Sequence, residues 1–369
     1  MTTKFDTKND VHTQVINTVT CTVKVKIPDA FSHKLKQLYT PALKCARRML
    51  QRRNENSTKH YKEIPSVIAK SLIAKYQRNA KCRNIKSLVL PICGDKGKQI
   101  KLVEGGVRIP VLFKKDVLPV TWPRKVVGYV RSVEFYHREG QWYGTFCYNT
   151  TAELPVLARD VVGLDRNSAG NIAVLADPCT GKVIKLGLSP APTKQAMRGR
   201  RKNLQHAGKF RLLSKLRRKQ RRRMAHENHR VAKTVVDYAA RHCRAVAIEK
   251  LANVRSAKSK IRRYSESNQW AFAQLETFIR HKAALRGVAI IEVEPAYTSQ
   301  TCSRCGSIHK PQGKRFVCKS CGHNDHRDAN AAFNIALRGR GRIGESSSGL
   351  SVPELGLIGD PQAGKAVAA

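Results

Sequence analysis

The chain has 369 residues and carries 70 lysines and arginines against 26 aspartates and glutamates, a formal net charge of +44. Hydrophobic residues make up 41% of it, which is enough for a buried core and excludes a largely disordered protein. A surface this positive repels itself unless a polyanion neutralises it, and the usual polyanion is nucleic acid. A membrane surface or a ribosome is the alternative partner.

The start of the chain has no apolar signal-peptide segment, and no apolar run approaches the roughly 18 residues that span a bilayer. We therefore expect a soluble, intracellular protein of the cytoplasm or nucleoid that is not secreted and does not enter a membrane. Seven of the eleven cysteines are scattered, which favours buried or free thiols in a reducing compartment; they are Cys21, Cys45, Cys82, Cys93, Cys147, Cys179 and Cys243.

Residues 1–155 predict a mixture of strands and helices. Residues 15–27 alternate between apolar and polar and predict a strand, and Thr40 followed by Pro41 predicts the start of a helix. A second helix is expected where four apolar residues share one helical face, namely Ile68, Leu72, Ile73 and Tyr76.

Strand-like runs follow the helices of this first part. Residues 107–113 read as one strand, and residues 126–136 and 142–148 read as a hairpin with a turn near Arg138 to Gln141. Three aromatic residues share one face of the hairpin. We expect them in the core, with a base-stacking platform as the alternative; they are Trp142, Phe146 and Tyr148.

From about residue 156 the pattern changes to strands with helices between them, which indicates an α/β fold. Strands are expected on both sides of a turn in residues 161–178, and again in residues 245–251 and 288–295. An extremely basic helical segment covers about 197–242, and residues 267–287 predict an amphipathic helix.

Four cysteines form the strongest local motif. Two C-x-x-C pairs, Cys302 with Cys305 and Cys318 with Cys321, are separated by twelve residues, and a glycine follows each pair. Such pairs each direct two thiolates at one centre, so the spacing predicts a structural zinc with no open position for catalysis. In the loop between the pairs, Lys310, Lys314 and Arg315 would contact phosphate or lie on ordinary solvated surface.

Three acids stand in apolar or constrained settings. Asp165 and Glu249 lie in predicted buried strands, and Asp328 begins a predicted helix after the cysteine motif. A buried carboxylate is costly unless it is paired or binds a metal. Any one of the three alone would more often be a paired structural acid, but together they suggest a shared centre.

The basic segment contains no acid between Met197 and Glu227. A run of charge is usually a solvated helix face, but repulsion at this density favours contact with a polyanion. The candidate nucleic-acid contacts are Arg200, Arg201, Lys202, Arg217, Arg218, Lys219, Arg221, Arg222 and Arg223, together with Arg315 of the cysteine motif.

These motifs resemble those of the TnpB proteins, the RNA-guided nucleases of insertion sequences, and are similar to those of type V CRISPR effectors and Fanzor proteins. GLDRNSAGNIAV, AVAIEKL and DANAAFNIAL resemble the three RuvC motifs, and EPAYTSQTCSRCG with FVCKSCG resembles the zinc-ribbon signature. The strong resemblance covers about residues 160–338. One departure is Asn167, because the family often has glycine two residues after the first acid.

The resemblance implies an α/β fold with an RNase H-like (RuvC) nuclease core and an inserted zinc ribbon, preceded by a β-rich wedge domain with a helical recognition insert. The implied boundaries are 1–155 for the wedge, with the insert at about 29–85; 156–300 for the core, with the basic insert at about 197–242; 301–324 for the ribbon; and 325–338 for the end of the core. Residues 339–369 are expected to be a disordered tail.

The resemblance further implies an RNA-guided, Mg-dependent DNA endonuclease associated with a transposable element. Asp165, Glu249 and Asp328 would be catalytic and hold two Mg²⁺ ions, and one Zn²⁺ would be structural. The partners would be a guide RNA, target DNA as an RNA–DNA heteroduplex and an adjacent duplex motif. The alternatives are a guide-dependent repressor without useful cleavage, a transposase or recombinase accessory protein, and a zinc-ribbon RNA-binding protein.

Overall fold

The computed structural model describes residues 18–80, 82–154, 156–167, 170–188, 191–250 and 262–342, with backbone alone for 191–198 and 262–272. The expected tail from residue 343 onward lies outside the described residues. The chain forms two compact units, which divide between Ala152 and Glu153.

The first unit is built on a four-stranded antiparallel sheet in the order β1-β7-β6-β2. A small three-stranded sheet, β3-β4-β5, accompanies it. The strands are β1 (Thr18–Lys26), β2 (Val89–Cys93), β3 (Lys101–Val103), β4 (Gly106–Arg108), β5 (Val117–Pro119), β6 (Val130–Arg138) and β7 (Gln141–Thr151). The helices are α1 (Asp29–Gln51), the 3-10 turn η1 (Thr58–His60), α2 (Ser66–Leu72), the π-turn η2 (Ile73–Gln77) and α3 (Pro110–Phe113).

The aromatic residues of the β6–β7 hairpin are core residues, which confirms the first of the two interpretations. Trp142, Phe146 and Tyr148 are at most 3% exposed. Tyr39 of α1 packs edge-on against Trp142, with ring centroids 5.7 Å apart. No open stacking platform therefore exists on that face of the hairpin.

Two sequence expectations in this unit are wrong, and each involves a proline: the start of a helix at Pro41 and a strand through Pro110. Helix α1 begins at Asp29 and runs through Pro41, rather than beginning beside it. Buried residues on one face lie on both sides of Pro41, such as Leu35 and Cys45, and their burial outweighs the hydrogen bond that proline cannot donate. The expected strand at 107–113 ends at Arg108, because Pro110 starts the short helix α3 instead.

The second unit contains a five-stranded mixed sheet in the order β10-β9-β8-β11-β12, which confirms the α/β expectation. Strands β8, β11 and β12 are parallel, and β9 and β10 are antiparallel additions. The strands are β8 (Asp160–Arg166), β9 (Asn171–Asp177), β10 (Lys182–Leu188), β11 (Arg244–Glu249) and β12 (Ile290–Val293), and a separate pair is formed by β13 (Arg315–Val317) and β14 (Asn324–His326).

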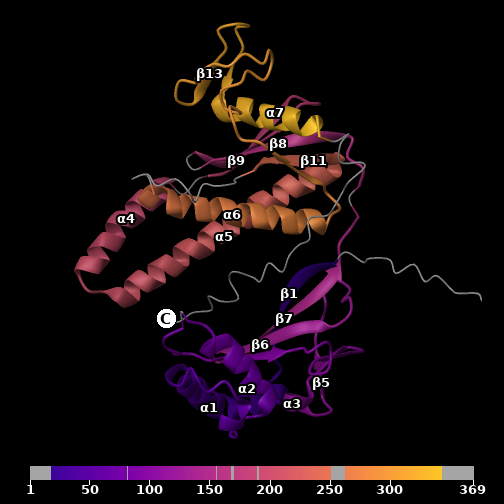
Figure 1. The fold of residues 1–369 in the computed structure, drawn as a ribbon, viewed down its shortest axis with the longest axis vertical. Coiled ribbons are helices and arrows are strands. Elements are labelled where there is room, and N and C mark those ends of the chain that lie inside the picture. The colour runs from indigo at the N-terminus through magenta and orange to yellow at the C-terminus, as the bar shows by residue number, and fades with distance from the viewer. Residues whose placement is uncertain are drawn as a thin grey trace, which may run out of the picture. The chain divides into compact units, whose positions relative to one another are not determined.

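Helices cover both faces of this sheet (Figure 1). Helix α5 (Phe210–Arg241) and helix α6 (Arg262–Ala284) pack on one face, where Val235 and Leu275 meet Val162 and Ile248 in a common core. Helix α7 (Arg327–Arg340) packs on the other face through Ile335, and it extends two residues beyond the expected end of the core.

Two glycines bring α7 unusually close to the sheet. A Cβ atom on Gly163 of β8 would lie 1.9 Å from the carbonyl oxygen of Ala332, and one on Gly339 would lie 2.8 Å from the Cβ of Ala247. Side chains at these positions would clash with backbone or packed methyl groups. The glycines therefore set the distance between α7 and the strands that it covers.

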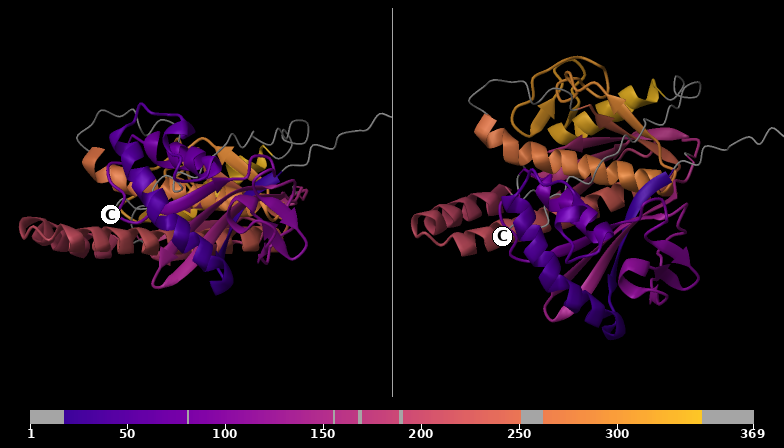
Figure 2. Two further views of the ribbon diagram at one scale, coloured as in Figure 1. Left: turned by 90° about the horizontal axis from the view of Figure 1, so that it is seen from below. Right: turned by 60° about the horizontal axis from the view of Figure 1, so that its bottom comes forward.

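The basic segment forms a helical hairpin that projects beyond the sheet (Figure 2). Its arms are α4 (Ala191–His206) and the first half of α5. The buried residues of α5 are Leu213 and a group that begins only at Asn228. The first half of α5 is thus largely solvated, whereas the second half belongs to the core. Within the described residues, no helix combines the length and apolar character needed to span a bilayer.

Candidate acidic site and four-cysteine metal centre

The three predicted acids come from three different elements of the second unit. Asp165 lies near the end of β8, Glu249 is the last residue of the neighbouring strand β11, and Asp328 is in the first turn of α7. The parallel register pairs Leu164 with Ile248, so the next residue of each strand is an acid. Strand pairing therefore places Asp165 and Glu249 side by side at the carboxyl ends of two adjacent interior strands.

The carboxyl group of Asp165 interacts electrostatically with both of the other acids. Its residue is 9% exposed, and burial together with the negative charges of Glu249 and Asp328 raises the pKa of its carboxyl group to about 7. A hydrogen bond from the Asn167 amide, 3.0 Å from Asp165 Oδ2, acts in the opposite direction. The carboxylates of Glu249 and Asp328 thus lie close enough to Asp165 for the three acids to form one electrostatic cluster.

Asp328 is surrounded by basic groups. Its residue is 2% exposed, and Lys314 Nζ lies 2.7 Å from its Oδ2, while Arg327 Nε lies 3.4 Å from its Oδ1. Its position in the first turn of α7 adds the favourable field of a helix N-terminus. Lys314 was predicted to contact phosphate or to lie on solvated surface; its side chain is 45% exposed, and its ammonium group also pairs with the Asp328 carboxylate.

The buried side chain of Arg166 connects the ends of β8 and β11 to helix α6. The Arg166 side chain is 2% exposed; it donates to the carbonyl oxygen of Glu249 at 2.5 Å and to Glu276 Oε2 of α6 at 2.7 Å. The sequence analysis did not identify this role. Its signal was a basic residue directly after Asp165 in an otherwise apolar strand, which must point to the opposite face of the sheet.

Asn167, which stands where the TnpB proteins often have glycine, contacts Asp165. Its backbone N–H donates to the Ile172 carbonyl across the β8–β9 turn, and its side chain donates to Asp165. A glycine could make the first contact but not the second. The substitution therefore adds a donor that orients one oxygen of Asp165.

The three acids have the chemistry of a hard divalent-cation site, although within the described residues only the four cysteines have ligand atoms that all lie within 4.8 Å of one another. Carboxylate oxygens are the ligands that Mg²⁺ prefers, and a cation would neutralise the charge that raises the pKa of Asp165. Asp165, Glu249 and Asp328 are the residues that could hold it. This chemistry suits the polarisation of a phosphodiester and the activation of water.

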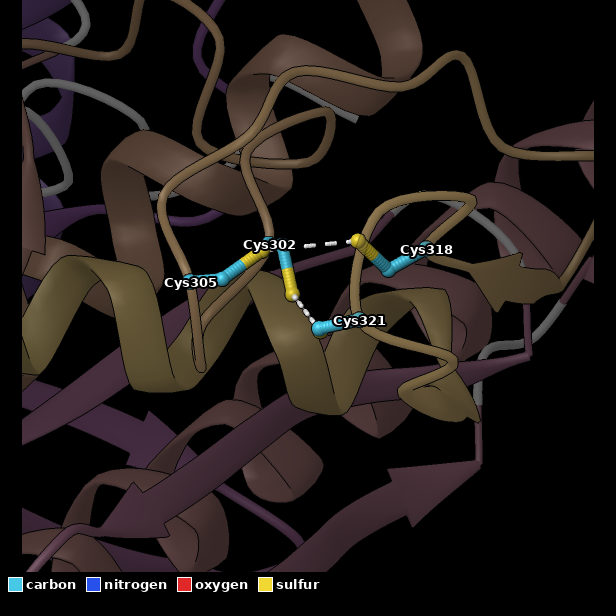
Figure 3. A group of neighbouring side chains, drawn as sticks. All are labelled: Cys302, Cys305, Cys318 and Cys321. Carbon is cyan, nitrogen blue, oxygen red and sulfur yellow. Dashed lines mark hydrogen bonds between the residues drawn. The ribbon is translucent and has the colours of Figure 1, made fainter.

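The four predicted cysteines converge on one point (Figure 3). Their sulfur atoms all lie within 4.8 Å of one another, with Cys302 and Cys321 at 3.7 Å and Cys305 and Cys318 at 3.5 Å. Four sulfurs at about 2.3 Å from a central zinc would be separated by roughly these distances. The cluster therefore fits a tetrahedral metal ion of the zinc type.

The backbone around the cysteines repeats itself in two equivalent turns. The N–H of Cys302 donates to Ser307 and that of Cys318 to His323, while Gly306 and Gly322 each donate back to the first cysteine of their pair. Both glycines have positive φ, 77° and 72°. Glycine adopts positive φ without steric strain, which explains why a glycine follows each cysteine pair.

The candidate nucleic-acid contacts do not gather at the acidic cluster. Apart from Arg315, they lie on α4 and on the solvated half of α5, where Arg201 and Arg218 are half-buried and the others are exposed. Arg315 is exposed on β13 and donates to Asn324 Oδ1 at 3.1 Å. The structure thus separates a basic arm from an acidic, metal-suited centre.

The second unit is therefore an α/β domain that contains both a group of three interacting acids and a four-cysteine centre. Residues 272–335 match the model of the Cas12f1-like TNB domain family. This match spans part of α6, the cysteine cluster and most of α7.

Individual relatives carry related names. The chain is 36% identical over 116 residues to a CRISPR-associated endodeoxyribonuclease Cas12f1 of Sulfoacidibacillus thermotolerans, covering 30% of this chain and 26% of that protein. It is 30% identical over 127 residues to a TnpB-like protein of Methanocaldococcus jannaschii, covering 34% and 46%. It is 26% identical over 344 residues to the putative RNA-guided DNA endonuclease InsQ of Escherichia coli K12, covering 84% and 83%.

These relatives confirm the resemblance to the TnpB proteins and the related type V effectors. The extent of the likeness differs between them. The chain spans about a quarter of the Cas12f1 relative and about half of the TnpB-like relative, whereas it spans most of InsQ.

Proposed function

We propose that this protein is an RNA-guided DNA endonuclease of a transposable element, with a metal-dependent nuclease site at Asp165, Glu249 and Asp328. The observation that carries the proposal is the electrostatic cluster of these three acids at the carboxyl ends of adjacent strands in a mixed sheet. The names of the TnpB-like, InsQ and Cas12f1 relatives support the reaction and the guide.

The proposal includes an RNase H-like, RuvC-type core. It is supported by the sheet order, in which three parallel strands continue into an antiparallel pair, and by helices on both faces. The first unit would be the wedge domain, with α1 and α2 as its recognition insert between β1 and β2. The segment with the four cysteines would be a zinc ribbon inserted before α7.

Asp165, Glu249 and Asp328 would hold two Mg²⁺ ions, which supply charge neutralisation at the phosphate and an activated water. The protein's own groups prepare this site. Burial and the two neighbouring acids raise the pKa of Asp165 to about 7, and a cation held there would favour its ionised form. Lys314 and Arg327 balance the charge of Asp328, and Asn167 and Thr298 each orient one carboxylate.

The guide RNA and the RNA–DNA heteroduplex would lie against the basic arm formed by α4 and the first half of α5. This arm has dense positive charge and few buried side chains, so its arginines are free to contact phosphate. Such contacts would position the nucleic acid, and base pairing would supply the sequence. One Zn²⁺ at the four cysteines would stabilise the ribbon.

The test is purification of the chain with its bound RNA, followed by plasmid cleavage with a matched guide and added Mg²⁺. We expect cleavage that depends on Mg²⁺ and on a matched target, and that Asp165→Ala abolishes while RNA and DNA binding remain. Equal cleavage by Asp165→Ala would show that the reaction occurs elsewhere. Guided binding without cleavage by the unaltered protein would favour a repressor.

A further inference from the structure

We propose that the loop of residues 298–303, here called the entry loop, couples the four-cysteine centre to the acidic site, and that Thr298 is the positioning residue of Glu249. The inference rests on the proposed function, because it assigns Glu249 to cation binding. It adds a residue and a connection that the three acids and four cysteines alone do not include.

Thr298 contacts Glu249 directly. Its residue is 5% exposed, and its hydroxyl oxygen lies 2.6 Å from Glu249 Oε1. The same hydroxyl lies 3.2 Å from the Pro295 carbonyl oxygen. The hydroxyl has one proton to donate, and the shorter contact with an anionic acceptor is the stronger of the two. Thr298 thus fixes one oxygen of Glu249 and leaves the other for a cation.

Two buried asparagines of α7 hold the entry loop. Asn334 Nδ2 donates to the carbonyl oxygens of Thr298 at 2.9 Å and Thr301 at 2.6 Å. Asn330 Nδ2 donates to Thr301 at 2.7 Å, and its Oδ1 accepts the N–H of Ser303 at 2.9 Å. Asn330 and Asn334 are 0% and 5% exposed, so loss of these bonds would leave buried polar groups unpaired.

The entry loop is connected to both centres. Cys302, inside the loop, contributes one sulfur to the cysteine cluster. On the other side, β12 precedes the loop, and its Val293 carbonyl accepts the N–H of Lys250, the residue after Glu249. A metal ion at the cysteines would therefore restrain the loop at Cys302, and the restraint would reach Glu249 through Thr298.

Outer hydrogen bonds of this kind tune the affinity of a metal site because they restrict the ligand to its binding orientation. Without the hydroxyl, the Glu249 side chain can rotate away from Asp165. We therefore expect a change in cation affinity rather than in nucleic-acid binding. Loss of such a partner typically lowers metal affinity about 10- to 100-fold.

The experiment compares Thr298→Val with Thr298→Ser in the full chain with its bound RNA. Valine keeps the shape of threonine without the donor, and serine keeps the donor. Terbium luminescence titrations measure cation binding at the acidic site, with Asp165→Ala to identify that site's signal, and cleavage is followed against Mg²⁺ concentration. Circular dichroism and thermal unfolding check that each variant folds.

We expect Thr298→Val to shift both midpoints to about 10-fold higher cation concentration, and Thr298→Ser to stay near the unaltered protein. Titrations of Thr298→Val that match the unaltered protein would overturn the inference and leave the proposed function standing. If the unaltered protein and Asp165→Ala bind terbium equally, the acidic site is not a cation site, and both proposals fail.

A second variant tests the coupling. Asn334→Asp replaces a double donor with an acceptor that repels the carbonyls of Thr298 and Thr301. We expect faster hydrogen exchange in residues 298–303 and the same direction of shift in the terbium midpoint. Faster exchange with an unchanged midpoint would overturn the coupling, because the loop would then move without affecting Glu249.

Discussion

Asp165 is the residue at which burial and charge act together most strongly. Its pKa of about 7 lies well above that of an aspartate in an unfolded chain, about 3.9, because burial and two neighbouring acids disfavour the anion. Between these two pH values the folded chain holds a proton that the unfolded chain has released. Without a cation, the free energy of unfolding therefore falls as the pH rises through this window.

We predict that Asp165→Asn removes this pH dependence, since asparagine is neutral at every pH. Without added divalent cations, the melting temperatures of the two proteins should be similar at about pH 4, near the pKa of the unfolded chain, and should begin to differ above it. At pH 8 the variant should be more stable, since the loss amounts to roughly 1.4 kcal/mol per pH unit across the window. Thermal unfolding from about pH 4 to pH 8 measures the difference. A difference that does not vary with pH would contradict the prediction.

At the scale of elements, the close packing of α7 on β8 decides where Asp328 lies. Gly163 faces the backbone of Ala332 and Ala336, so an added methyl group would meet atoms that cannot turn aside. The helix would have to move away from the sheet. Because Asp328 begins that helix, its distance from Asp165 and Glu249 would change as well.

We predict that Gly163→Ala destabilises the second unit by about 1–3 kcal/mol or more and lowers cleavage further than stability alone explains. The matched control is Gly199→Ala on α4, where the added methyl group would meet nothing within 4 Å and favours the helix. Thermal unfolding and cleavage at a temperature where both variants are folded measure the two effects. A Gly163→Ala protein as stable and active as the control would contradict the close packing.

The sequence predicted elements well where periodicity was strong and poorly where tertiary packing decided. The strands of Asp165 and Glu249 and the turns of the cysteine pairs followed from apolar runs and spacing. The start of α1 was missed because burial overrides Pro41, and β10 was missed because only Leu186 within it is fully buried. Thr298 gave no signal, since its contact with Glu249 joins residues 49 positions apart.

At the scale of the whole molecule, the net charge of +44 is distributed unevenly. The second half of α5 forms ion pairs through Asp237 with Lys233 and Arg286. The solvated half carries its arginines on exposed surface next to α4. Long-range attraction of nucleic acid would therefore come mainly from the arm, and its strength would depend on ionic strength.

We predict that replacing Arg221, Arg222 and Arg223 together by alanine weakens RNA binding to a similar degree for different sequences. The slope of the logarithm of the affinity against the logarithm of the salt concentration should fall in magnitude by about 2–3, because each phosphate contact contributes about 0.7–0.9. Filter binding at several salt concentrations measures the slope. An unchanged slope would place the phosphate contacts elsewhere, and unfolding curves would show that the variant is intact.

Helix α7 performs three tasks within fourteen residues: it supplies Asp328, holds the entry loop through two asparagines and packs on the sheet through small residues. Nine of the fourteen residues are buried. Most positions of α7 are therefore packed against a neighbour, whereas the exposed arginines of the arm contribute charge without such packing. Substitutions would therefore be tolerated rarely along α7 and readily along the arm, so the charge of the arm can change in sequence while the surroundings of Asp328 stay the same.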